Sequence, residues 1–517
     1  MREKFVIKNI FAKLLSTGLV TLLSFISKKV YVNSLGDEIM GLNALLLSVI
    51  SMLSLIELGI GNAIYFSLYK PLAEKDEKQI TAIMRLYAKI YMIIGLLVLV
   101  IGIVVIPFLH FFSTKLPDRI LYGAYIIMLL DTALSYYMAY RRNIFNADQK
   151  EFFNTNVDTF VNVAISCVQM AAVVVTKNYF LFLGIKLMGT VIGNLYIYIQ
   201  SGRRYPYLKK KTSYQLSEEF KHTFKENVKA LCIINISTYL VFGTDNLLLS
   251  TFTTLTAVFI YSNYTAILTA VNQVFHQTFN SMQASVGNFM VIEGKDKSYE
   301  LFKKIFFINF LVTSYTSTAL ITLFNSAITI WMGDKYVWPM AVVAILVFNN
   351  YSRYIIQAAS IFKNAAGLYS PTPIYKYLAL LEGIINLIAS LFFICVCKLQ
   401  IMGVFIGTSV STIVSTIGIP YAIYRYYFKC EAKQYIQRYI QYLALTFIYC
   451  TVSVILYQCV RTPYEVCNLF LGLVISFVVP FGLSTLLFNK TEEYVFVLDI
   501  VKRYIGKIKN RKNMEEV

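Results

Sequence analysis

Charged side chains are scarce in this sequence. They make up 15% of its 517 residues, whereas soluble domains carry about 25%. Histidine is scarcer still, because its three copies, His110, His222 and His276, are scattered and lack the spacing of metal ligands. The chain also has no glycine-rich phosphate loop and no nucleophile–base pairing. These absences argue against an enzyme, and the sequence predicts no catalytic site, no metal and no cofactor.

Most of the sequence consists of long runs of apolar residues. Apolar residues make up 57% of the chain, and they recur in runs of about 20 residues, which is the length that a helix needs to cross a bilayer. A porin-like barrel would show short alternating segments instead. The sequence therefore predicts an all-α polytopic membrane protein with about fourteen transmembrane helices, at 10–33, 40–66, 83–108, 120–141, 155–176, 179–200, 228–250, 256–290, 304–332, 338–362, 374–396, 401–424, 439–460 and 465–488.

Basic residues outnumber acidic ones and give a net charge of +19. They are not gathered in one domain, so we predict no binding of nucleic acid. They lie instead in alternate loops, as orientation signals do. The side poor in positive charge holds only Lys115, Arg119, Lys177, Lys335, Lys398 and Arg461. By the positive-inside bias that side is the outer one, and both termini are predicted to be cytoplasmic.

The two halves of the chain repeat one another in spacing and hydropathy. The segments 155–176 and 179–200 correspond to 374–396 and 401–424. Parallel repeats of this kind are typical of several transporter folds, so we predict two pseudo-symmetric six-helix lobes plus two extra helices. The expected parts are an N-terminal lobe at 1–200, a cytoplasmic amphipathic linker at 201–227, a C-terminal lobe at 228–427, the two extra helices in 428–488 and a basic cytoplasmic tail at 489–517.

Glu57 lies near the middle of the second apolar run. A carboxylate at the bilayer midplane is costly, so it should face a cavity or a partner, and it is a functional candidate by default. The small residues Gly59 and Gly61 beside it allow another interpretation, in which Glu57 is a structural carboxyl at a helix contact. The sequence leaves both interpretations open.

Two predicted helices carry polar stripes where lipid-facing helices would be apolar. Residues spaced three and four apart share one helix face, and such a face needs water, substrate or polar partners. We expect the two stripes to line a shared, water-filled cavity. The stripe of the first helix consists of Lys13, Thr17, Thr21, Ser24, Lys28 and Tyr31, and that of the eighth of Thr265, Thr269, Asn272, His276, Asn280 and Gln283.

Ionisable residues inside the predicted spans are the remaining candidates. Arg353, Lys28, Lys29 and Lys186 could form an anion site for phosphate groups, with arginine as the forked ligand. The three lysines could instead snorkel to the outer interface, whereas Arg353 is too central to do so. Asp131 and Asp245 join Glu57 as candidates for carrying a coupling ion, and Glu382 is a further buried acid.

Four stretches of the first 200 residues resemble one known family. These stretches are Gly41-Leu-Asn, Leu53-Ser-Leu-Ile-Glu-Leu-Gly-Ile-Gly-Asn-Ala, Leu68-Tyr-Lys-Pro-Leu-Ala-Glu-Lys-Asp and Tyr136 to Lys150. They resemble the second helix, its following loop and the loop after the fourth helix of bacterial polysaccharide repeat-unit flippases of the Wzx type. That family is part of the multidrug/oligosaccharidyl-lipid/polysaccharide exporter (MOP) superfamily.

The resemblance implies a MATE-like fold of two lobes that alternate between inward-open and outward-open states. It implies that undecaprenyl-pyrophosphate-linked oligosaccharide repeat units are flipped from the inner to the outer leaflet of the bacterial plasma membrane, for capsule, O-antigen or exopolysaccharide assembly. Membrane lipids and polysaccharide polymerase or assembly proteins are the implied partners. A MATE-type drug/cation antiporter is the first alternative. A membrane glycan polymerase or ligase is a second, against which the short outer loops argue.

Overall fold

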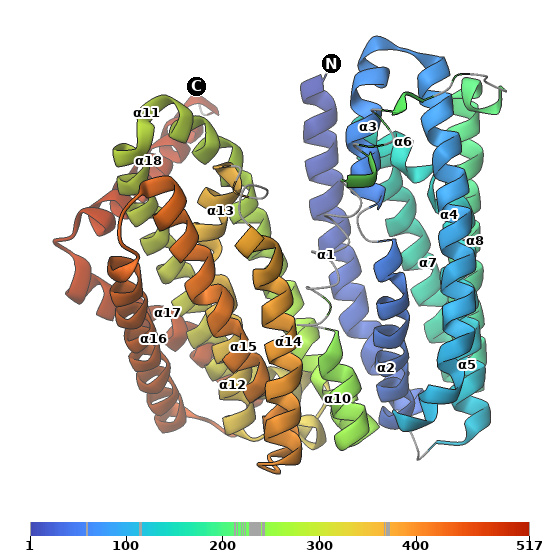
Figure 1. Ribbon diagram of the computed structural model, residues 1–517. Coiled ribbons are helices and arrows are strands. Elements are labelled where there is room, and N and C mark those ends of the chain that lie inside the picture. Colours follow the sequence, from blue (N-terminus) through green and yellow to red (C-terminus); the bar gives the residue numbers. More distant parts are fainter. Residues whose placement is uncertain are drawn as a thin grey trace. The chain divides into compact units, whose positions relative to one another are not determined.

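The computed structural model describes residues 2–57, 60–112, 116–210, 243–366 and 373–515, together with Leu368 and a few positions between 214 and 239. The chain divides into two compact units, Met1–Ser262 and Asn263–Val517. Each unit is a bundle of long helices (Figure 1).

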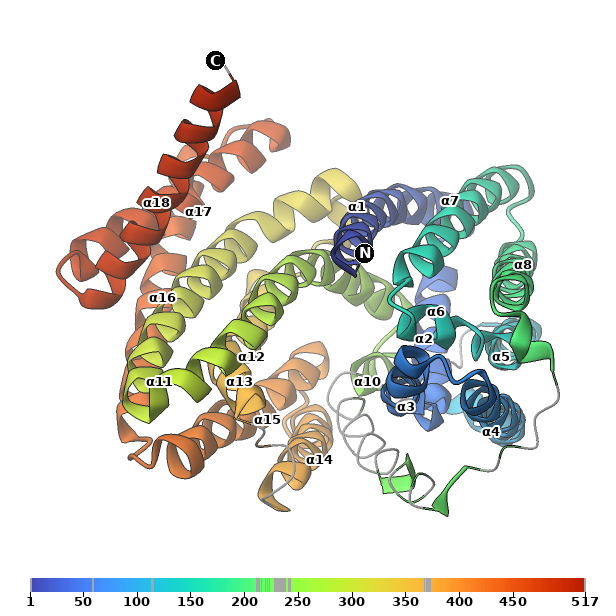
Figure 2. The same ribbon diagram turned by 90° about the horizontal axis from the view of Figure 1, so that it is seen from above.

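The first unit is built from helices that pack side by side around a common centre (Figure 2). Around this bundle α1 contacts α7 and α2, α8 contacts α7 and α5, and α4 contacts α5 and α2. Its elements are α1 (Arg2–Leu35), α2 (Asp37–Leu53), η1 (Ser54–Ile56), α3 (Ile60–Glu74), α4 (Glu77–Val105), η2 (Ile106–Phe111), α5 (Asp118–Ala139), α6 (Arg142–Ala147), α7 (Glu151–Thr176), α8 (Tyr179–Arg204), η3 (Pro206–Lys209) and α10 (Thr244–Phe252).

Short polar caps begin two of these helices. The Asp76 carboxylate accepts a hydrogen bond from the Gln79 amide at 3.0 Å and starts α4. The Asn178 side chain accepts from the Phe180 and Leu181 amides and starts α8. Asparagine and aspartate satisfy the free amides of a first helical turn, so these apolar helices begin at defined residues close to the ends of the preceding ones.

The second unit consists of α11 (Leu255–Trp331, of which the first residues belong to the first unit) and the helices that follow. The helix α11 changes direction at Gly294, whose φ of 79° is not helical. The other elements are η4 (Asp334–Tyr336), α12 (Met340–Tyr354), α13 (Gln357–Ala365), α14 (Pro373–Cys395), α15 (Gln400–Ala422), η5 (Ile423–Phe428), α16 (Lys433–Val460), α17 (Glu465–Phe488) and α18 (Glu492–Glu515).

A close helix crossing joins α14 to α15 in the second unit. The motif Gly403-Val-Phe-Ile-Gly407 has glycines four residues apart, the spacing that lets membrane helices approach closely. A Cβ atom at Gly407 would lie 2.1 Å from Ser390 Oγ, and one at Gly403 would lie 2.9 Å from the Ile394 amide nitrogen. The contact between the two backbones therefore requires glycine at both positions.

Aromatic residues fill the core of the second unit. Phe302, Phe306, Phe310, Tyr435 and Tyr442 are all buried and contact one another ring to ring. Each such ring buries a large area and adds a preferred geometry. This cluster fixes α16 against the second half of α11.

The described residues confirm the predicted class, an all-helical membrane protein. Ten helices are long and apolar enough to span a bilayer, and each of the fourteen predicted segments overlaps a helix. Two predicted segments are each divided between separate α-helices, and most of a third, 228–250, lies outside the described residues. The α-helix of segment 40–66 ends at Leu53 and is followed by η1, and 338–362 is split between α12 and α13. Hydropathy reports apolar length and is insensitive to such breaks.

The predicted linker and tail differ in what the structure describes. The linker, 201–227, is described continuously only to Lys210, through the end of α8 and η3, and several of its later positions lie outside the described residues. The tail forms α18, whose first turns dock on the second unit: Glu493 pairs with Arg438 at 2.6 Å, and Tyr494 is buried. Burial opposes ionisation of Glu493, but its hydrogen bond from Arg438 holds the pKa of that carboxyl below its usual value. The start of the tail is therefore a packed helix.

Candidate functional site

A polar cavity in the first unit brings Glu57 together with residues from four other elements. Glu57 follows η1 and accepts a hydrogen bond from the Tyr91 hydroxyl of α4 at 3.0 Å. The cavity has a volume of about 220 Å³. Its lining residues are Glu57, Tyr91, Ala139, Arg142, Asn143, Asn146, Glu151, Asn154, Thr155 and Asp158.

Arg142 is the central cation of this cavity. Its guanidinium donates to both carboxylate oxygens of Asp158, at 2.7 and 2.8 Å, and to Asn194 Oδ1 at 2.8 Å. Both bonds to Asp158 come from Nη1, and charge-assisted hydrogen bonds of this kind are stronger than neutral ones. Three acids, Glu57, Glu151 and Asp158, line the cavity with this one arginine, so the cavity is acidic on balance and suits a cation or a proton better than an anion.

Two buried amide groups in the same cavity have unused hydrogen-bonding capacity. Asn154 is 5% exposed and donates to the Arg142 carbonyl and to Asn146 Oδ1, but its own Oδ1 has no hydrogen-bond partner among the described residues. Asn143 Nδ2 is likewise unpaired there. Buried polar atoms usually find a partner, so the Asn154 oxygen is available to something that enters the cavity. The described residues contain no cluster of three metal-binding side chains.

The other two acidic candidates lie elsewhere in the first unit. Asp131 is half-buried on α5, and its Oδ1 has no hydrogen-bond partner among the described residues. Asp245 is buried on α10 and accepts from the Tyr261 hydroxyl at 2.7 Å. Neither lines the cavity at Glu57, so Glu57 is the only one of the three that does.

The lysine candidates of the first unit are placed differently from one another. Lys28 Nζ donates to both the carbonyl and the hydroxyl of Ser262, at 2.8 and 2.9 Å, which ties α1 to the start of α11. This contact differs from snorkelling, the alternative considered from sequence. Lys29 and Lys186 are half-buried, on α1 and α8 respectively.

Arg353 lies in the last turn of α12, immediately before a break in the helix. A side chain of another helix satisfies the carbonyl groups at this break. Asn309 Nδ2, on α11, donates to the carbonyls of Tyr354 at 3.1 Å and Ile355 at 2.6 Å. The end of a helix leaves carbonyl groups without partners and is partially negative. A cation is favoured at this position, and the sequence alone did not show the break.

Arg353 also acts on a buried acid of α14. Its charge interacts with Glu382, which is 7% exposed and accepts a hydrogen bond from Ser415 of α15. One turn further along α14, Asn386 donates to Thr408 Oγ1 at 3.0 Å. A buried carboxylate needs such compensation. The arginine and the acid are therefore electrostatic partners in a polar zone between α12, α14 and α15.

The polar stripe of the eighth predicted helix meets α12 in this zone. Asn272 Nδ2 donates to Asn350 Oδ1 at 2.9 Å, and the His276 ring contacts Tyr354 edge to face at 5.3 Å. His276 and Asn280 are exposed, one turn apart on α11. The structure thus brings Asn272 and His276 beside the segment that carries Arg353.

Sequence reasoning missed Arg142 and Asp158 as candidates. Arg142 was predicted to lie in a cytoplasmic loop, but it begins the short helix α6 and points to α7. A signal for it existed, because Arg142 falls inside the stretch from Tyr136 to Lys150 that carries the family resemblance. The pairing with Asp158 depends on the fold and has no signal in the sequence.

The fold is that of MOP-superfamily transporters. A solved structure titled lipid II flippase MurJ, in an inward closed conformation, is similar with a TM-score of 0.68 and 15% identity, over 93% of this chain and 99% of that one. An inward-facing multidrug resistance transporter of the MATE family is similar with a TM-score of 0.58 and 12% identity, over 78% and 94%. A MOP-superfamily transporter from Pyrococcus furiosus is similar with a TM-score of 0.51 and 12% identity, over 82% and 96%.

The sequence gives the family within that class. Residues 6–282, more than half of the chain, match the family described as "Polysaccharide biosynthesis protein", and the protein belongs to this family. A comparison with curated protein sequences gives no match. The predicted MATE-like fold is confirmed, and the Wzx-type substrate and activity stay predictions.

Proposed function

We propose that this protein is a flippase for lipid-linked oligosaccharide. It moves undecaprenyl-pyrophosphate-linked repeat units from the inner to the outer leaflet of the bacterial plasma membrane by alternating access, and so supplies capsule, O-antigen or exopolysaccharide assembly. The single observation that carries the proposal is the family match over residues 6–282. The similarity in fold to a lipid II flippase over nearly the whole of both chains supports it.

Physical chemistry favours the same substrate class. A pyrophosphate and its sugars cannot cross hydrocarbon, because each polar group would be unpaired there. In this proposal Arg353 pairs with a phosphate oxygen, while the amide of Asn272 and the ring of His276 on α11 contact the sugar. Lys28, Lys29, Lys186 and Asn280 are further candidates for contacts with the headgroup, and polymerase or assembly proteins receive the product.

Glu57 is proposed to couple transport to an ion. Its carboxylate, the unpaired Asn154 oxygen and the acidic lining of the cavity together suit a proton or a small hard cation, which prefers oxygen ligands. Asp131 and Asp245 remain secondary candidates for this role. Ion uptake at Glu57 would bias the first unit toward one of its two access states.

A drug/cation antiporter is the second candidate function. The acidic cavity at Glu57 favours it, because an organic cation and a proton could compete for the same carboxylates, and a MATE transporter shares the fold. In that case Arg353 would serve only to neutralise Glu382.

Reconstitution separates the two functions. The purified protein is placed in vesicles loaded on one side with a polyprenyl-pyrophosphate oligosaccharide, and transfer is measured by the exposure of the sugar to an external glycosidase. A parallel sample measures uptake of a fluorescent organic cation. We expect transfer of the lipid-linked sugar and no cation uptake. Cation uptake without sugar transfer would reject the flippase.

A further inference from the structure

Two cavities of the second unit join end to end between α11, α12 and α16. The first is an apolar groove of about 490 Å³, and the second is a polar pocket of about 580 Å³. Ile321, Met340 and Val454 line both of them, so the apolar groove and the polar pocket are direct neighbours. No residue of α17 lines either cavity.

The apolar groove has the length of one leaflet. Its lining on α12 runs from Met340 to Tyr351, which corresponds to about 17 Å of helix. Half of the bilayer's hydrocarbon core is about 15 Å. The bulky residues Phe348, Phe447 and Ile455 along the groove are exposed, as expected of a groove that opens toward lipid tails.

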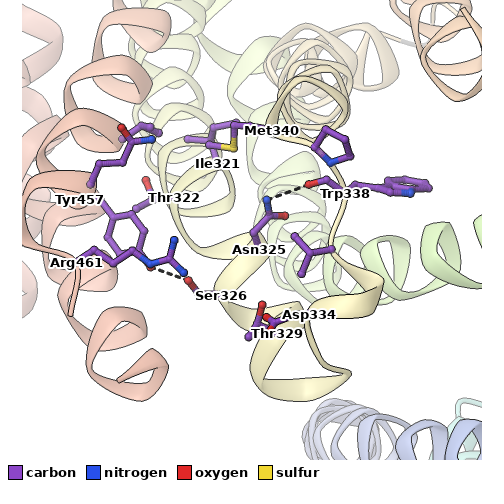
Figure 3. A pocket seen from close by; sticks show the side chains of 14 residues that line it. Ile321, Thr322, Asn325, Ser326, Thr329, Asp334, Trp338, Met340, Tyr457 and Arg461 are labelled. Carbon is purple, nitrogen blue, oxygen red and sulfur yellow. Dashed lines mark hydrogen bonds between the residues drawn. The ribbon is translucent and has the colours of Figure 1, made fainter. Parts of the chain in front are cut away.

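The polar pocket lies at the loop ends of these helices, on the side predicted to be the outer one. Figure 3 shows Arg461 at the end of α16, Thr329 on α11 and Asp334 in the loop after α11. Its base is a hydrogen bond of 2.6 Å between Ser326 and the Tyr457 hydroxyl, which joins α11 to α16. Opposite charges therefore line one pocket.

A buried hydroxyl of the pocket has no hydrogen-bond partner within the part of the chain that the structure describes. Thr322 is 4% exposed and lines the polar pocket, and its Oγ1 has no hydrogen-bond partner among the described residues. A buried hydroxyl without a partner costs about 1–3 kcal/mol. The groups on Asn325 are already used, because it accepts from the Tyr264 hydroxyl and donates to the Trp338 carbonyl. Thr322 thus offers a hydrogen bond to an occupant of the pocket.

We propose that α11, α12 and α16 hold one phospholipid of the bilayer, with an acyl chain in the apolar groove and a zwitterionic, amine-bearing headgroup in the polar pocket. The headgroup phosphate pairs with the Arg461 guanidinium, and its ammonium group pairs with the Asp334 carboxylate. A strongly anionic headgroup such as a pyrophosphate does not suit this pocket, because Asp334 lines it and Glu465 already pairs with Arg461 at 2.6 Å. The site is independent of the proposed transport of oligosaccharide.

Native mass spectrometry of the full-length protein tests the proposal. Delipidated protein is titrated with phosphatidylethanolamine or phosphatidylglycerol of the same acyl chains, or with a polyprenyl phosphate. We expect one tightly retained phosphatidylethanolamine, at least threefold above either anionic lipid. Equal or stronger retention of an anionic lipid would overturn the headgroup assignment.

Variants locate the bound lipid. Ala344→Trp fills the groove from α12, and Thr451→Trp fills it from α16 should the first variant fail to fold. Each should lower retained phosphatidylethanolamine at least fivefold. Ala444→Trp is the matched control, because Ala444 is exposed on α16 and does not line the groove. Undiminished retention in a folded groove variant would overturn the site.

Headgroup variants complete the test. Asp334→Asn should bring retention of phosphatidylethanolamine down to that of phosphatidylglycerol, because only the ethanolamine headgroup carries the ammonium group. Arg461→Gln should lower retention of both lipids, because both carry the phosphate. Lys398→Gln, an exposed change outside the pocket, should leave the threefold preference intact. A preference that persists in Asp334→Asn, or undiminished retention of both lipids in Arg461→Gln, would contradict the assigned headgroup contacts.

Discussion

Arg353 combines three features of its surroundings. It ends a helix, it acts on a buried acid, and it lies beside the polar face of another helix. A charge in this environment is retained only if something compensates for its burial. Arg353 can therefore have either of two roles, to bind the substrate's phosphate or to neutralise Glu382. Mutation separates these roles.

We expect Arg353→Ala to lower transfer of lipid-linked oligosaccharide by about 10- to 100-fold, because a hydrogen bond to a charged group contributes about 1.5–3 kcal/mol. Arg353→Lys keeps the charge but loses the forked geometry, so its transfer rate should lie between those of Arg353→Ala and the unchanged protein. The vesicle assay described above measures this. Recovery of full transfer in the double variant Arg353→Ala/Glu382→Gln would show that Arg353 only neutralises the acid.

Glu57→Gln should lower transport and abolish its dependence on an imposed proton or sodium gradient, because the amide cannot exchange a proton or balance a cation. Tyr91→Phe removes the hydrogen bond to the carboxylate and should weaken the ion dependence less. Glu74→Gln, at an exposed end of α3, is the control. Transport by Glu57→Gln with an unchanged gradient dependence would assign Glu57 a structural role.

For individual residues, the sequence predicted the candidates themselves better than the residues with which they interact. Glu57 and Arg353 were found because ionisable groups are rare in apolar runs. The hydrogen bond of Glu57 with Tyr91 and the electrostatic interaction of Arg353 with Glu382 span 34 and 29 residues of chain, and the pattern of one helix carries no information about them. Arg142 was not identified as a site residue for a different reason, because an arginine near a predicted loop resembles an orientation signal.

Among the elements, the crossing of α14 and α15 is the most constrained. We expect Gly407→Leu to destabilise the protein by about 1–3 kcal/mol or more, because the new side chain would meet the backbone and hydroxyl of Ser390. Thermal unfolding in detergent measures the effect. Gly482→Leu on α17 is the matched control, since nothing lies within 4 Å of its Cβ position. A normal melting temperature for Gly407→Leu would mean that the helices can separate without loss.

The elements were predicted well where a helix is continuous and poorly where it breaks. Apolar length alone located α4, α5, α8, α14 and α17. The break between α12 and α13 depends on the amide of Asn309, which lies 45 residues away from Tyr354 in the chain. A distant side chain that satisfies the free carbonyls makes such a break tolerable inside a membrane, and hydropathy cannot detect it.

For the whole molecule, the distribution of lysine and arginine predicts the topology. We expect a reporter that is active only in the cytoplasm to work when fused after residue 150 or residue 300, and one that is active only outside to work after Lys398. The charge bias is the physical reason, since positively charged loops are retained on the cytoplasmic side. The opposite pattern would invert the topology and move the phospholipid pocket to the inner leaflet.

The one non-helical residue inside α11 has a consequence for how this protein can evolve. Gly294 reverses the sign of φ at one residue, and the chain resumes helical geometry on either side. Adding one residue after it would rotate the following helix by about 100°. Phe302, Phe306 and Asn309, all 2% exposed or less, would then turn away from the core. This joint therefore sets the rotational phase of a whole transmembrane helix, and we expect its length to tolerate no insertion.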